Sequence, residues 1–72
     1  MIFVTIGTEL PFDRLVRTVD QWASDEGISG IFAQIGKGGW EPKHMKYCNF
    51  LSPIEFDERF QSATLIISNA GM

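Results

Sequence analysis

The chain has 72 residues and a mass of 8.1 kDa, so it forms one domain at most, and its folding buries only about 60% of the surface that the extended chain exposes. Hydrophobic residues make up 44% and charged residues 21%, which excludes a disordered tail, a collagen-like repeat and a coiled coil. Six basic against nine acidic residues give a net charge of -3, which disfavours nucleic acid and anionic membrane surfaces as partners.

The first half of the sequence predicts a strand, a helix and a second strand. The β-branched and apolar run 2–6 ends at a glycine, which is typical of a buried strand. Apolar residues then recur with a 3.6-residue period, which predicts an amphipathic helix that ends at Gly27. The apolar positions of this helix are Phe12, Leu15, Val16, Val19, Trp22 and Ala23. A further apolar run, 29–35, predicts the second strand.

The second half predicts a strand, a capped helix and a last strand. Residues 45–51 alternate loosely and contain aromatic residues, which favours a third strand. The segment 52–55 reads Ser-Pro-Ile-Glu, the pattern of a capping box with proline at the first helical position. This helix is expected to run to about Gln61 or Ala63, and the run 64–68 predicts the fourth strand. Its apolar positions are Ile54, Phe56 and Phe60.

Strands that alternate with helical patterns predict an α/β fold with a mostly parallel sheet. The connection between 29–35 and 45–51 has roughly ten residues, which is short for a parallel crossover, so an antiparallel third strand is an open alternative. If 64–68 returns beside 2–6, its apolar residues Leu65, Ile66 and Ile67 are exposed. The chain is then either a fragment of a larger domain or is covered by another chain, and we favour the fragment.

Two turns are candidates for ligand binding. In open α/β sheets, ligands bind beyond the carboxyl ends of the strands, where the chain reverses its direction across the sheet. Gly7 and Thr8 lead into the first helix, whose free N–H groups favour an anion such as phosphate, although a plain turn with a helix cap is an equal alternative. The second turn offers small polar residues close to the backbone, or is a simple exit turn: Ser68, Asn69 and Gly71.

The remaining polar residues favour structural roles. Loop 36–43 has two alternative interpretations: it contacts an anion, or it is a solvated loop whose Trp40 ring packs against the sheet. We favour the solvated loop. Asp13 acts as a base or, as we favour, stabilises the start of the helix. His44 and Cys48 are too few and too far apart on a strand to hold a metal, so no metal site is expected.

Three stretches together resemble the C-terminal domain of glycosyltransferase family 28: VTIGTELPFDRLVRTVD, QIGKGGWEP and FLSPIEFDERFQSATLIISNAGM. The resemblance covers essentially all of residues 1–72 and is strongest to the small donor-binding subunits of two-component sugar transferases. The V-T-x-G-T-x-x-x-F-D-R-L opening and the final I-I-S-x-A-G are specific in combination. The resemblance implies one domain, the N-terminal part of a Rossmann-like half of a GT-B C-terminal domain.

The resemblance also implies an activity. The family members are hexosyltransferase-type enzymes that use a nucleotide-sugar, here a UDP-sugar, as substrate without a further cofactor. The acceptor would be a sugar linked to polyprenyl or dolichyl diphosphate. It would be bound by a separate membrane-anchored subunit, which would hold this otherwise cytoplasmic protein at the membrane.

The donor-binding residues follow from their positions in the motifs. Gly7 and Thr8 match the glycine loop near the donor diphosphate, and Phe50 with Leu51 matches the segment that flanks the uracil. The second glycine motif begins with Ser68, Asn69, Ala70 and Gly71. No catalytic residue is assigned by these matches.

Two departures from the family pattern limit the expected activity. Asn69 stands where many relatives carry histidine. The glycine-rich turn, helix and ribose-binding acidic residue that follow the second motif in the family are not part of this sequence. We therefore expect this chain alone to have no transfer activity. The alternative function is a non-enzymatic interaction module that forms a homo-oligomer through the exposed strand 64–68.

Overall fold

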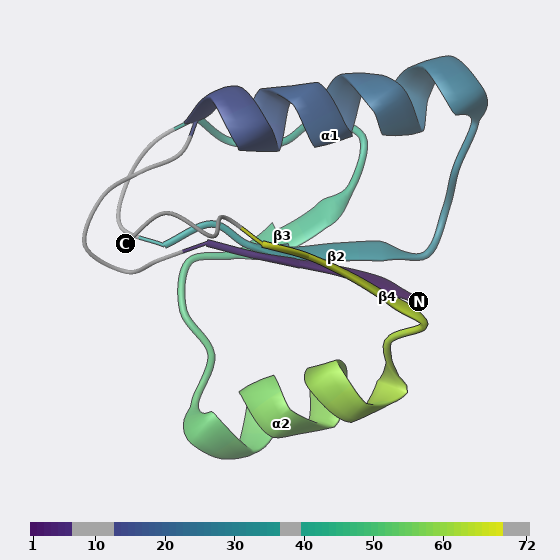
Figure 1. The fold of residues 1–72 in the computed structure, drawn as a ribbon. Helices are drawn as coiled ribbons and strands as arrows, with labels where there is room; N and C mark the ends of the chain where they lie inside the picture. The colour runs from purple at the N-terminus through teal and green to yellow at the C-terminus, as the bar shows by residue number, and fades with distance from the viewer. Residues whose placement is uncertain (7–12, 37–39, 69–72) are drawn as a thin grey trace.

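The computed structural model of the chain describes residues 1–6, 13–36 and 40–68. Its strands and helices form an α/β arrangement in which β2 and β3 are consecutive among the described elements (Figure 1). In chain order they are β1 (Ile2–Thr5), α1 (Asp13–Glu26), β2 (Ile31–Gln34), β3 (Lys46–Cys48), α2 (Pro53–Ser62) and β4 (Leu65–Ser68). The expected order and type of the elements are confirmed. The third strand is shorter than the expected 45–51, because its pairing with β2 ends near Cys48.

The four strands form one sheet in the order β3-β2-β1-β4, and all neighbouring strands are parallel. The antiparallel alternative for the third strand is therefore wrong. The chain moves from β1 through β2 to β3 at one edge and then returns through α2 to the other side of β1. This is a Rossmann-like topology with α1 on one face of the sheet and α2 on the other (Figure 1).

The loop that connects β2 to β3 is short for a parallel crossover, and its residues Trp40, Lys43 and His44 bond to side chains of α1. The backbone N–H of Trp40 donates to Asp13 Oδ1 at 3.0 Å, and the Arg17 guanidinium lies 5.4 Å from the centre of the Trp40 ring. Further along the loop, the N–H groups of Lys43 and His44 donate to Asp20 Oδ1 at 3.1 and 2.7 Å. These contacts hold the loop against α1, so no helix is needed in this connection. Trp40 is half-buried as expected, but its contacts are with α1 as well as the core cluster, and Asp13 lies in the first turn of α1, where its structural alternative places it.

The hydrophobic core lies between the sheet and α1. Its buried members come from α1, from β1 and β2, and from the residue after each of these strands: Val4, Ile6, Val16, Val19, Ala23, Ile31, Ala33 and Ile35. The predicted amphipathic face of α1 is confirmed at Leu15, Val16, Val19 and Ala23, whereas Trp22 is 39% exposed and Phe12 lies outside the described residues. The buried face of α1 is centred on Val16, Val19, Asp20 and Ala23, and Trp22 lies on its flank.

The opposite face of the sheet is covered less completely by α2. The rings of Phe3 and Phe56 meet edge to face with centroids 5.4 Å apart, yet no residue of α2 is buried. Of the apolar positions expected for this helix, Ile54 is 74% exposed and Phe60 is 47% exposed. The helix is held at its start by the predicted capping box, in which Ser52 and Glu55 bond each other's backbone N–H groups at 3.2 Å.

Strand β4 forms one edge of the sheet, as expected. Leu65 is 49% exposed, whereas Ile66 and Ile67 are half-buried, so the expected exposure is confirmed only for Leu65. Within residues 1–6, 13–36 and 40–68, neither helix has the length and apolar character that a membrane span requires.

Candidate functional site

The two turns that the sequence singles out follow strands whose ends lie side by side. Thr5 of β1 and Ser68 of β4 are register partners in the parallel sheet, and each is the last residue of its strand. The expected switch point between β1 and β4 is therefore confirmed by the strand order. The predicted site residues that follow these strand ends lie outside the described residues: Gly7, Thr8, Asn69, Ala70 and Gly71.

Phe50 and Leu51 follow β3 at the same carboxyl edge of the sheet. The segment before them is fixed to the residues after β2, because Gly36 N–H donates to the Asn49 carbonyl at 2.8 Å and Asn49 Nδ2 donates to the Gly36 carbonyl at 2.9 Å. The Phe50 side chain is 54% exposed and Leu51 is half-buried. An exposed aromatic ring in a fixed segment offers a surface on which a flat ring can stack.

A row of polar side chains crosses the sheet just before its carboxyl edge. The register aligns one residue from each strand: Ser68, Thr5, Gln34 and Cys48. The row faces α2, because side chains alternate along a strand and Phe3, two residues before Thr5, contacts Phe56 of α2. Parallel strands with both faces covered are normally apolar along their whole length. In this sheet the row lies on the face that α2 covers incompletely, and no buried polar side-chain atom of the described residues lacks a hydrogen-bond partner.

Hydrogen bonding already organises the centre of this row. Thr5 Oγ1 donates to Gln34 Oε1 at 3.0 Å, and Gln34 is 6% exposed. A buried amide that is held in one orientation presents its remaining polar groups in a defined direction. At the end of the row, Ser68 is exposed and carries a hydroxyl that both donates and accepts.

Cys48 contributes a neutral group rather than a nucleophile. Partial burial raises the pKa of its thiol, and nearby Glu55 raises it further, while the positive charge of Arg59 opposes the shift. A thiol with a raised pKa stays protonated at neutral pH, and only the thiolate is strongly nucleophilic. The row therefore suits recognition of a polar ligand by hydrogen bonds, and it supplies no general acid or base.

Sequence reasoning missed Thr5 and Gln34 as site residues, although a signal for them exists. The segments 2–7 and 31–36 read IFVTIG and IFAQIG, and they place a polar residue two positions before a glycine in both strands. A polar residue in an otherwise apolar strand, next to a glycine turn, marks the edge at which α/β sheets bind ligands. The periodicity alone could not separate this polar position from the rest of a buried strand.

No known protein family, curated protein or solved structure matches the chain. In the part of the chain that the structure describes, no three side chains among histidine, cysteine, aspartate and glutamate are grouped as a metal site requires.

Proposed function

We propose that the chain binds a nucleotide-sugar, a UDP-sugar, at the carboxyl edge of its sheet. It would do so as part of a glycosyltransferase that transfers a hexosyl or N-acetylhexosaminyl group to an acceptor linked to polyprenyl or dolichyl diphosphate. The observation that carries the proposal is the register pairing of Thr5 with Ser68. Because of it, the V-T-I-G-T and I-I-S-N-A-G sequences leave neighbouring strand ends at a switch point, where parallel sheets bind nucleotides.

The polar row and Phe50 support the same proposal. The hydroxyls of Thr5 and Ser68 and the amide of Gln34 match the hydrogen-bonding groups of a ribose or a diphosphate. The exposed Phe50 ring suits stacking on the uracil. Gly7 and Thr8, which precede α1 in the sequence, would supply backbone and hydroxyl donors to the diphosphate.

Transfer itself needs more than this edge supplies. Cleavage of the donor leaves a nucleoside diphosphate whose developing charge must be stabilised by fixed donors, and the polar row holds no proton-transfer group. We therefore assign donor binding to this chain, and acceptor binding to a membrane-anchored partner subunit that completes the enzyme.

The experiment is a titration of the full chain, labelled with nitrogen-15, with UDP-N-acetylglucosamine, followed by amide NMR. We expect shifts at Thr5, Gln34 and Ser68, similar shifts with UDP, and none with N-acetylglucosamine alone. Ser68→Ala removes one hydroxyl bond and should weaken binding about threefold to tenfold, while Ser24→Ala on the exposed face of α1 is the matched control. Equal affinity of the two variants, or no shift with either uridine ligand, would refute the donor site.

A kinetic test is available once a partner subunit restores transfer. Thr8→Ala should then raise the Michaelis constant for the donor or lower turnover. If Thr8 only caps the helix, the variant would instead lose about 1 kcal/mol of stability with unchanged kinetics. Transfer by the 72-residue chain without a partner would contradict the division of labour proposed above.

Self-association through β4 is the second candidate function. The observation that favours it is that Leu65 is 49% exposed on an edge strand that contains neither charge nor proline. Natural sheets usually protect an exposed edge with such residues, so an unprotected edge is suited to pairing with a second copy. Sedimentation velocity should show a concentration-dependent dimer that Leu65→Lys abolishes, and a monomer at all concentrations would exclude this function.

A further inference from the structure

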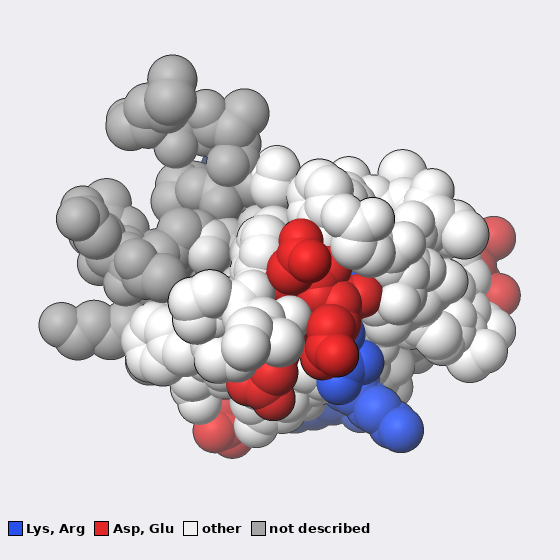
Figure 2. Space-filling view, turned by 90° about the horizontal axis from the view of Figure 1, so that it is seen from below, with Lys and Arg blue, Asp and Glu red and all other residues white. Residues whose placement is uncertain are grey.

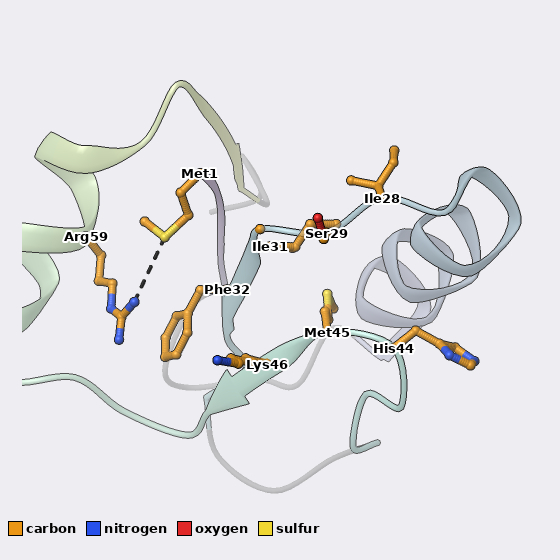
Figure 3. Close-up of a pocket in the computed structure, with 10 residues that line it drawn as sticks. Met1, Ile28, Ser29, Ile31, Phe32, His44, Met45, Lys46 and Arg59 are labelled. Carbon is orange, nitrogen blue, oxygen red and sulfur yellow. Dashed lines mark hydrogen bonds between the residues drawn. The ribbon is translucent and has the colours of Figure 1, made fainter.

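A cavity lies at the edge of the sheet opposite the proposed donor site. It has a volume of about 610 Å³ and opens where β2 and β3 begin, beside the first residue of the chain (Figure 3). This is within the range of cavities that hold small molecules. Its apolar lining includes Met1, Ile31, Phe32 and Met45, and its cationic lining includes Lys46 and Arg59.

Arg59 reaches the cavity from α2, and its guanidinium lies over an aromatic ring. Its guanidinium carbon is 3.9 Å from the centre of the Phe32 ring, and Nη1 lies 4.0 Å from the Met1 sulfur (Figure 3). A thioether is a weak acceptor and a ring accepts no conventional hydrogen bond. These contacts orient the guanidinium, and its strong N–H donors remain suited to an oxygen acceptor in the cavity.

A second cation approaches the same ring. Lys46 of β3 is the register partner of Phe32, so both side chains leave the same face of the sheet, and Figure 3 shows the Lys46 amino end turned toward the ring. Two positive charges beside one ring repel each other unless an anion lies between them. Among the described residues that line this cavity none is acidic, although acidic residues outnumber basic ones by nine to six in the chain.

Neighbouring carboxylates restrict the charge of a ligand. Glu55 and Glu58 line an adjoining hollow on α2 that shares Met1 and Arg59 with the cavity. Figure 2, which views the molecule from the α2 side, shows acidic side chains beside basic ones on this face. These carboxylates would repel a dianionic phosphate more strongly than a ligand with a single negative charge, which Arg59 and Lys46 still attract.

We propose that this cavity binds a small amphipathic carboxylate, a molecule with one carboxylate group and an aromatic or aliphatic body. The carboxylate would lie between Arg59 and Lys46, and the apolar body would lie against Phe32 and Met1 on the same side of the sheet. The site is separate from the proposed donor site, because it lies at the amino ends of the strands. Its test is therefore independent of uridine binding.

The test is an NMR titration of the full nitrogen-15-labelled chain with 2-naphthoate at millimolar concentration. The neutral probe is 2-naphthalenemethanol, and the anionic probe without an apolar body is inorganic phosphate. We expect 2-naphthoate to shift the amides of Phe32, Met45 and Lys46 and to bind much more tightly than either other probe. Arg59→Met and Lys46→Gln should each weaken binding about tenfold, whereas Arg14→Gln on the exposed surface of α1 should leave it unchanged.

Several results would overturn the proposal. If 2-naphthalenemethanol binds as tightly as 2-naphthoate, Arg59 and Lys46 do not contribute to binding. If phosphate binds as tightly as 2-naphthoate or more tightly, the apolar lining does not contribute. If Arg14→Gln weakens 2-naphthoate binding as much as Lys46→Gln does, the loss of affinity comes from the change in net charge and not from a contact in the cavity. Because Lys46 is exposed, Lys46→Gln remains a valid test even if Arg59→Met does not fold. No shift with any probe would also refute the site.

Discussion

Replacing Asp20 by alanine should destabilise the chain more than any surface substitution on α1. Asp20 is 3% exposed on the buried face of the helix, and its Oδ1 accepts the backbone N–H groups of Lys43 and His44 at 3.1 and 2.7 Å. These two bonds hold the loop that carries the chain from β2 to β3. Alanine removes both acceptor contacts and leaves two backbone donors without a protein partner.

The magnitude follows from the charge and the burial of this contact. A hydrogen bond to a charged group contributes about 1.5–3 kcal/mol, so two such bonds give an upper bound of about 6 kcal/mol. Lys43 and His44 are exposed, so water can bond their backbone N–H groups when the carboxylate is removed, and part of the lost free energy is regained. We expect a net loss of about 3 kcal/mol, which is close to the whole stability of about 3–5 kcal/mol that a core of this size supplies.

The assay is urea unfolding of the full chain, followed by far-ultraviolet circular dichroism. Asp20→Asn keeps the Oδ1 acceptor and should lose about 1 kcal/mol, the difference between a charged and a neutral acceptor. Asp25→Ala is the matched control, because Asp25 is exposed on the same helix and its carboxylate accepts from the exposed Gln21 side chain at 2.8 Å. Hydrogen exchange at the Lys43 and His44 amides should accelerate in Asp20→Ala. The reasoning fails if Asp20→Ala and Asp25→Ala unfold at the same urea concentration.

Three further predictions concern the core, the reactivity of the Cys48 thiol and the pH dependence of stability. The Val16 side chain is 1% exposed, so Val16→Ala should lower the free energy of unfolding by about 2 kcal/mol. The Ile54 side chain is 74% exposed, so Ile54→Ala should change it by less than about 0.5 kcal/mol. Equal urea midpoints for the two variants would contradict a core that lies mainly on the α1 face. Burial raises the pKa of the Cys48 thiol above its ordinary value, so iodoacetamide should alkylate the folded chain more slowly at neutral pH than the chain in urea. Because the unfolded thiol ionises first, this group should also lower stability as pH rises above the ordinary thiol pKa, and a Cys48→Ala variant should lack that component.

The sequence allowed the elements to be predicted because local patterns and tertiary packing agree. The run 2–6 and the capping box at Ser52 each carry their own structural signal, and both lie where those signals predict. The direction of β3 was left open because loop length is a statistical guide. It could not be read from the sequence that Asp13 and Asp20 would hold the loop by side-chain bonds to its backbone.

The candidate site was only partly accessible from the sequence. Glycine turns after apolar strands mark the carboxyl edge, so Ser68 could be predicted as a site residue. The alignment of Thr5 with Gln34 depends on the register between strands that lie far apart in the sequence, and register is set by packing across the sheet. The cavity near Arg59 depends in the same way on the return of α2 across the sheet.

The unequal covering of the two faces gives a physical reason for where both proposed sites lie. On the α1 face, a closed apolar cluster leaves no room for polar ligand groups, and this cluster supplies most of the burial. On the α2 face, no helix residue is buried, and the sheet carries polar residues there: Thr5 and Gln34, which bond each other, and the exposed Lys46. A small domain that placed polar residues on both faces of its sheet would bury too little apolar surface to remain folded. Binding groups are therefore concentrated on the face that contributes less to stability, and substitutions there should change ligand affinity more than the free energy of unfolding.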